Sequence, residues 1–203
     1  MRFLETGPHN KGDHRVADRQ TDCRLLDRRA LLAAAGASGI TLLAGPSLAR
    51  VPKPPSLERR LRFYNVHTEE RLDVAYWRRG RYHGGALFDI DYILRDWRTG
   101  DIVRIDRKLL DLLNDLHTQF ASEAPFHVIS GYRTAQTNAM LMNTSAAVAK
   151  NSFHVRAQAI DIYLPDVRLR DLQRAAVASK GGGVGYYPRS NFLHLDTGPV
   201  RRW

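Results

Sequence analysis

The chain has 203 residues, a formal charge of +10 and one cysteine. This length fits one ordinary domain with an extension. A hydrophobic share of 43% excludes a disordered chain. Residues 1–49 hold 7 of the 31 basic and 5 of the 21 acidic residues, so the rest carries 24 minus 16, or +8. This charge favours an anionic partner (nucleic acid, a membrane surface or a carboxylate-rich wall), and composition alone does not choose among them.

Residues 1–49 predict an export signal. Arg28 and Arg29 precede an uncharged run at 31–44, and Ser-Leu-Ala at 47–49 fits a small-x-small cleavage site. Twin arginines before a weakly hydrophobic run indicate the twin-arginine route to the periplasm. The run is shorter than the roughly 20 residues that span a bilayer, so we expect no stable membrane span after cleavage. An uncleaved anchor and an Ala/Leu-rich helix within a domain are the alternatives.

The single cysteine lies in the part that we expect to be removed, so the mature chain cannot form a disulfide. Residues 50–57 are proline-rich and predict a stiff spacer. One folded domain is then expected at 58–203. At its start, apolar residues alternate at 62–67 and 71–77 around a polar turn, which predicts a hairpin.

The strongest helical pattern runs from residue 106 to residue 120, where Asp106 can cap the first turn. Before this helix, residues 81–94 show no single periodic pattern, and Gly84 and Gly85 predict a loop. The pattern further predicts strands at 126–130, 159–164, 184–187 and 192–196, and helices at 135–149 and 168–179. Helices placed before and between mostly antiparallel strands predict an α+β fold, with a small sheet flanked by helices in one compact domain.

Two histidines lie beside aspartates in strand-like, apolar surroundings, where a buried carboxylate needs a partner or a metal. Strand alternation places Asp161 away from the neighbouring isoleucines, and puts His194 and Asp196 on one face. If His154 lies in a loop that bends back, then His154, Asp161 and His194 reach one ion and leave a position open for water. This is the arrangement of a hydrolytic zinc site. The alternative is a histidine packed on an aromatic ring and an aspartate that caps a loop.

Such a zinc ion would activate water and polarise the carbonyl under attack. Asp196 is then the candidate general base, and its alternative role is to orient His194 or to cap the following turn. Arg133, in a turn after a strand, is the candidate to stabilise the oxyanion. We interpret Tyr186 and Tyr187 as core or edge residues, with a cleft wall as the alternative. The other histidines after residue 49 are expected to be structural or on the surface: His67, His83, His117 and His127.

A series of motifs covers nearly all of residues 58–203 and resembles the YcbK-like family of murein endopeptidases. That family is related to the D-Ala-D-Ala carboxypeptidase and dipeptidase group, which includes VanX and the hedgehog fold. The motifs lie at residues 95–100, 130–134, 150–161, 182–187, 192–198 and 201–203.

The resemblance implies a zinc-dependent enzyme that hydrolyses peptide cross-links in peptidoglycan, with one zinc ion per domain. It assigns the zinc ligands to His154, Asp161 and His194, and the family's arginine to Arg133. Ser152 belongs to the first ligand motif, and with Tyr186 and Tyr187 it is a candidate to bind substrate. The expected partner is the peptidoglycan stem peptide, and no nucleic acid is expected because of the export signal.

The sequence departs from the wider group at two places. Ala157 stands where that group often has glycine, so a left-handed backbone there would be strained. No acid shortly precedes His194, where the group often takes its base, so the resemblance supports the three ligands but does not assign the base to Asp196. Two other functions stay open: a carboxypeptidase or dipeptidase that trims free stem-peptide ends, and a non-catalytic wall-binding module with a vestigial metal site.

Overall fold

The computed structural model describes residues 57–144 and 148–203. The predicted signal at 1–49 and residues 50–56 of the predicted spacer lie outside the described residues. Among the helices in these two ranges, none combines the length and hydrophobicity that are needed to cross a bilayer.

One eight-stranded mixed sheet runs through the domain in the order β3-β2-β1-β4-β5-β7-β6-β8. The β1–β4 and β6–β8 pairs are parallel and the other neighbours are antiparallel, which confirms the predicted α+β fold with a mostly antiparallel sheet. The strands are β1 (Glu58–Asn65), β2 (Arg71–Arg78), β3 (Arg81–Tyr82), β4 (Phe126–Ser130), β5 (Ala159–Tyr163), β6 (Gly183–Tyr187), β7 (Phe192–Asp196) and β8 (Arg201–Arg202).

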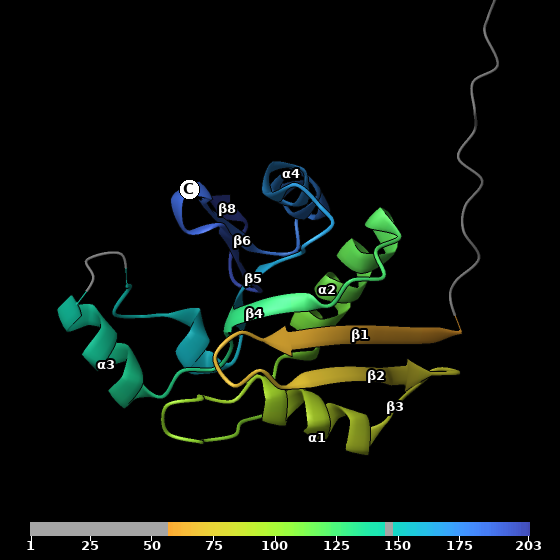
Figure 1. Ribbon diagram of the computed structural model, residues 1–203, viewed down its shortest axis with the longest axis horizontal. Coiled ribbons are helices and arrows are strands. Elements are labelled where there is room, and N and C mark those ends of the chain that lie inside the picture. Colours follow the sequence, from red (N-terminus) through yellow and green to blue (C-terminus); the bar gives the residue numbers. More distant parts are fainter. Residues whose placement is uncertain (1–56, 145–147) are drawn as a thin grey trace, which may run out of the picture. The chain divides into compact units, whose positions relative to one another are not determined.

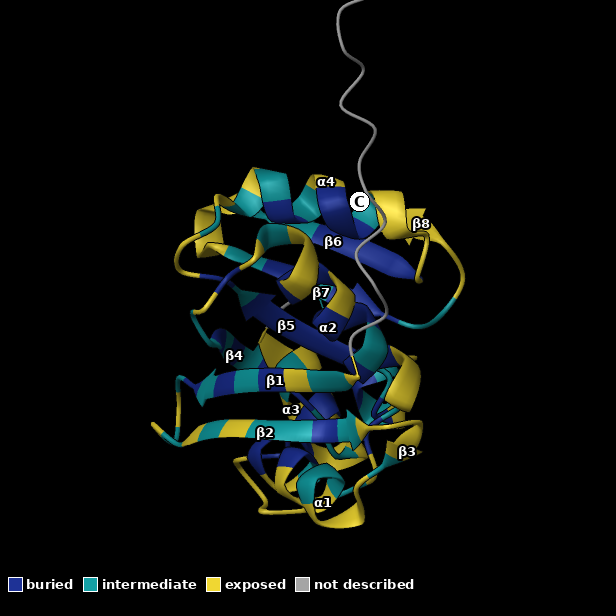
Figure 2. Cartoon of the chain, turned by 90° about the vertical axis from the view of Figure 1, so that its right-hand side faces the viewer, coloured by how far each residue is buried: buried dark blue, intermediate teal, exposed yellow. Residues whose placement is uncertain are grey.

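Four α-helices accompany the sheet, with α1 beside β2 and α4 beside β6 (Figure 1). Helix α2 packs against β1 and α4, while α3 projects from the domain (Figure 1). The central strand β5 is almost continuously buried and β6 is buried over its first three residues, whereas exposure alternates along β1 and β2 (Figure 2). The helices are α1 (Gly84–Ile93), α2 (Arg107–Phe120), α3 (Ala135–Thr144) and α4 (Leu169–Ser179), with 3₁₀ turns η1 (Phe153–Arg156) and η2 (Pro188–Ser190).

Helix α2 confirms the strongest sequence prediction. The Asp106 carboxylate accepts a hydrogen bond from the backbone N–H of Lys108 at 3.0 Å, which satisfies a free donor of the first turn. Its other oxygen accepts from the Thr197 hydroxyl at 2.7 Å. The same carboxylate therefore caps α2 and ties the start of the helix to the residue that follows β7.

Two predictions need correction. The loop predicted at Gly84 and Gly85 is wrong, because α1 begins at Gly84 and buries Ile90 and Ile93. The helix predicted at 135–149 ends at Thr144, and residues 148–150 are not helical. The hairpin is confirmed and is longer than predicted. The short strands β3 and β8 carry too few residues to show a periodic pattern.

Candidate metal centre

Strand pairing places four residues in one row across the sheet. Ser130 of β4 pairs with Asp161 of β5, Asp161 pairs with His194 of β7, and His194 pairs with Gly185 of β6. Residues directly opposite each other project to the same face of a sheet. The row therefore brings the predicted Asp161 and His194 together on one face.

The third predicted ligand comes from η1, in the segment where we expected a loop that bends back. The Ser152 hydroxyl accepts from the backbone N–H of His154 at 3.3 Å and caps this single turn. Ala157 ends the turn in a left-handed conformation, with φ 55°. The strain that the sequence predicted for alanine at this position is therefore present, and the chain turns back directly into β5.

Three donor atoms converge where these segments meet. His154 Nε2 lies 3.2 Å from Asp161 Oδ1 and 3.1 Å from His194 Nδ1, and His194 Nδ1 lies 2.9 Å from Asp161 Oδ1. The ligands of a tetrahedral zinc ion with bonds of about 2.0–2.2 Å stand roughly 3.3 Å apart. The three atoms therefore fit one such ion with only a small expansion.

Hydrogen bonds on the far side of each imidazole fix which nitrogen carries a proton. His154 Nδ1 lies 2.7 Å from the carbonyl oxygen of Gly131, to which its N–H donates. His194 Nε2 lies 3.0 Å from Asp196 Oδ2 and donates to that carboxylate. Each ring therefore turns a nitrogen lone pair toward Asp161. Two lone pairs and a carboxylate oxygen at this spacing form a donor set that can hold a metal ion.

Burial and neighbouring charges set the protonation of these groups. Burial lowers the pKa of His154, which favours the neutral imidazole that a metal requires. Burial opposes ionisation of Asp161, but the neighbouring His154 and His194 outweigh it and hold its pKa below the usual range. For His194, the effect of burial is outweighed by the neighbouring carboxylates of Asp161 and Asp196, which raise its pKa.

Asp196 is completely buried, and its oxygens are taken up by protein donors. Oδ1 accepts from the backbone N–H groups of Gly183 at 3.1 Å and Gly198 at 2.8 Å. The Arg201 guanidinium bonds to both oxygens, at 3.0 and 2.7 Å. Burial would raise the pKa of the Asp196 carboxyl, but His194 and Arg201 hold it below the usual range.

Arg133 lies against the donor atoms from the side of β4. Its Nε donates to the Ser130 hydroxyl at 2.7 Å, and its Nη2 donates to Asp161 Oδ2 at 2.5 Å. Nη2 also lies 3.3 Å from His154 Nε2. A cationic guanidinium is thus fixed within a few ångströms of the position that an ion would occupy.

The donor atoms open into a cavity of about 500 Å³. Ser152 and Tyr187 line it, whereas Tyr186 packs against the hydrophobic core. Trp203 forms one wall, with its ring 5.4 Å from that of His194 and its Nε1 donating to the Tyr187 hydroxyl at 2.8 Å. The indole occupies the space above Gly185, where a Cβ would lie 2.8 Å from the ring.

Sequence reasoning did not assign Arg201 or Trp203 to the site. Only the sequence resemblance included residues 201–203, and a two-residue strand offers no periodic signal. Of the four histidines expected to be structural or on the surface, three have side-chain contacts with protein groups, and His83 is exposed. His67, His117 and His127 contact the Ile129 carbonyl, the Ala124 carbonyl and the Tyr163 hydroxyl, respectively. In residues 57–144 and 148–203, the only metal-ligating cluster found is His154, Asp161 and His194.

A buried His/Asp/His donor set beside a fixed guanidinium, on one face of a mixed sheet and open to a cavity, suits the hydrolytic metal site of a metallopeptidase. Residues 54–203 match the family model Peptidase_M15_2, described as "Peptidoglycan L,D-endopeptidase MepK". The chain belongs to this family. The recognition of a murein endopeptidase from sequence motifs is thereby confirmed.

Among its relatives is the peptidoglycan L,D-endopeptidase MepK of Escherichia coli strain K12, 39% identical over 178 residues, which are 87% of this chain and 97% of the relative. The probable peptidoglycan L,D-endopeptidase MepK of Haemophilus influenzae is 41% identical over 170 residues, 82% of this chain and 89% of that protein. No solved structure matches the chain.

The donor set predicts one divalent metal ion per chain. His194→Ala removes one of three protein ligands, so affinity for the ion should fall more than about 100-fold while the fold survives. Metal analysis after dialysis measures this, with circular dichroism to check the fold and the exposed His83→Ala as control. A His194→Ala protein that retained one ion per chain would remove His194 from the ligand set.

Proposed function

We propose that this chain is a zinc-dependent peptidoglycan L,D-endopeptidase of the cell envelope, which hydrolyses peptide cross-links between stem peptides. The observation that carries the proposal is the convergence of His154, Asp161 and His194 beside Arg133 in an open cavity. Two nitrogens and one carboxylate oxygen suit zinc and leave a fourth position for water. The names of the relatives supply the bond type.

Two other functions are less well supported. A carboxypeptidase or dipeptidase would use the same donor set, but the family description and the relatives' names specify an endopeptidase. A wall-binding module with a vestigial site would not need both imidazoles to turn lone pairs toward Asp161. Because the donor set is complete and Arg133 is held beside it, we favour the enzyme.

The roles of the chain's own residues follow from their positions. Zinc, when bound by the three ligands, supplies the Lewis acidity that polarises an amide carbonyl and activates water. Arg133, anchored to Ser130, is placed to attract the negative charge that develops on the carbonyl oxygen. Ser152 acts mainly by capping the turn that carries His154. Tyr187 and Trp203 form a wall against which a peptide can lie.

Purified sacculi treated with the protein should release fragments in which L,D-linked cross-links are cut and D,D-linked ones remain. Mass spectrometry of the released muropeptides measures this. Chelation or His194→Ala should abolish release, and zinc should restore the chelated wild type. Products trimmed only at free stem-peptide ends would show a carboxypeptidase, and intact sacculi would refute the proposed function.

The sequence leaves two roles open for Asp196, that of general base and that of orienting His194 or capping a turn. The contacts of Asp196 favour the orientation of His194. Its Oδ2 lies on the side of the imidazole opposite to the metal-facing Nδ1. A general base must reach the attacking water, but Asp196 is fully buried, and Gly183, Gly198 and Arg201 take up its oxygens. We infer that Arg201 holds Asp196, which in turn fixes the tautomer and orientation of His194.

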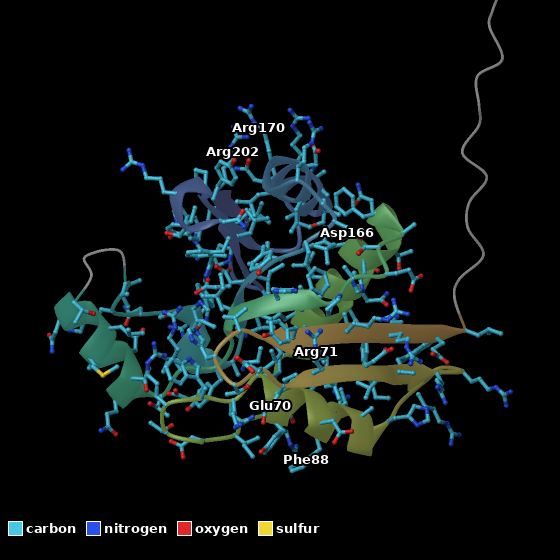
Figure 3. All side chains as sticks on the ribbon, viewed as in Figure 1. Glu70, Arg71, Phe88, Asp166, Arg170 and Arg202 are labelled. Atoms are coloured by element: carbon cyan, nitrogen blue, oxygen red, sulfur yellow. The ribbon has the colours of Figure 1, made fainter. Side chains whose placement is uncertain are left out.

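Asp196→Asn and Arg201→Gln should each weaken zinc binding about 10- to 100-fold, because both disturb the group that orients a ligand. Competition with a chelator measures the affinity. Arg202→Gln is the matched control, since Arg202 is the next residue and lies on the outer surface (Figure 3). Unchanged zinc affinity in Asp196→Asn, together with a fall in turnover of about 100-fold or more, would instead identify Asp196 as the general base.

A peptidoglycan substrate requires a location in the cell envelope, and we propose export to the periplasm by the twin-arginine route. The support is Arg28 and Arg29 before the uncharged run at 31–44. Replacing both arginines by lysine should leave the precursor in the cytoplasm, as cell fractionation would detect. Undiminished periplasmic protein would exclude this route, and an exported protein with an intact N-terminus would indicate an anchor.

A further inference from the structure

The turn that carries Arg133 is tied to a second arginine through one buried carboxylate. Asp96 lies in the connection between α1 and α2 and is 1% exposed. Its Oδ1 accepts from the backbone N–H of Arg98 at 3.1 Å. Its Oδ2 accepts from the backbone N–H and the hydroxyl of Thr134, at 2.9 and 3.0 Å. Asp96 therefore holds Arg98 next to the residue that follows Arg133.

An aromatic stack supports the Arg98 side chain. The Trp97 ring stacks on the His67 imidazole, with centroids 4.4 Å apart and an interplanar angle of 21°. The Arg98 guanidinium carbon lies 4.1 Å from the centroid of the Trp97 ring. At the other end of the stack, His67 Nε2 lies 3.0 Å from the carbonyl oxygen of Ile129, immediately before Ser130. The stack is thus anchored beside the same turn that positions Arg133.

The stack presents one positive charge, which belongs to Arg98. Burial lowers the pKa of His67, so its imidazole is neutral at neutral pH. Within the described ranges, the Arg98 guanidinium has no carboxylate at ion-pair distance, whereas the nearby Arg95 is paired with Glu70 at 2.8 Å. Burial and the charge of Arg133 lower the pKa of Arg98, against the opposing effect of Asp96.

A planar guanidinium that is fixed on an aromatic face and keeps its hydrogen-bonding edge free suits a carboxylate, because the two groups pair through two parallel hydrogen bonds. We propose that Arg98, supported by Trp97, binds a free carboxylate of the substrate peptide beside the cleaved bond. The proposal rests on the proposed function and deepens it. Arg98 is then a specificity-determining residue that distinguishes a peptide carboxylate from the corresponding carboxamide.

The test uses two cross-linked peptides that differ only in one group near the cleaved bond, a carboxylate in one and a carboxamide in the other. The wild-type protein should prefer the carboxylate peptide about 10- to 100-fold in kcat/KM, since a charged hydrogen bond is lost with the other. Arg98→Gln should abolish this preference, mainly by raising KM for the carboxylate peptide. Arg98→Lys keeps the charge without the fork and should retain part of the preference.

Arg104→Gln is the matched control, because Arg104 is an exposed arginine in the same connection and lies beside Asp91. It should keep the wild-type preference. An Arg98→Gln protein that kept that preference would overturn the proposal. Calorimetric binding of both peptides to the metal-free protein gives the same comparison without cleavage. Absence of cleavage would therefore refute the proposed function, whereas equal affinities for the two peptides would overturn the carboxylate site.

Discussion

Three electron-rich atoms must stay within about 3 Å of one another for this site to hold a cation, although they repel one another when no cation is present. Each is held by a group on its outer side. The Gly131 carbonyl fixes His154, the Asp196 carboxylate fixes His194, and the Arg133 guanidinium bonds to Asp161. Such outer partners determine which nitrogen faces the metal, so the ligands depend on them as much as on their own positions.

The sheet makes this arrangement possible through its register. A bulge between Val128 and Ser130 places Ser130 opposite Asp161, where regular pairing would place Ile129. The serine hydroxyl can then anchor Arg133 beside the carboxylate. The displaced Ile129 carbonyl lies 3.0 Å from His67, which begins the aromatic stack below Arg98. The one bulge in β4 therefore positions both the hydroxyl that anchors Arg133 and the carbonyl that contacts the stack below Arg98.

Close backbone approach around Asp196 limits which residues can surround the site. At Gly182, where φ is +156°, a Cβ would lie 1.9 Å from the backbone oxygen of Asp196. At Gly183, a Cβ would lie 2.5 Å from Asp196 Oδ2 and would displace Arg201. Gly182 and Gly183 thus form the surface on which the buried carboxylate lies.

The sequence by itself determined the elements with strong local patterns and the identity of the three candidate ligands. Helix α2 has both periodicity and a capping aspartate, and His154, Asp161 and His194 lie in recognisable motifs. Tertiary structure decided the rest, because those features depend on contacts between distant residues. Packing against β2 makes α1 helical despite Gly84 and Gly85, and pairing of β8 with β6 brings Arg201 to Asp196. Neither interaction leaves a local signal, because α1 opens on two glycines and β8 has only two residues.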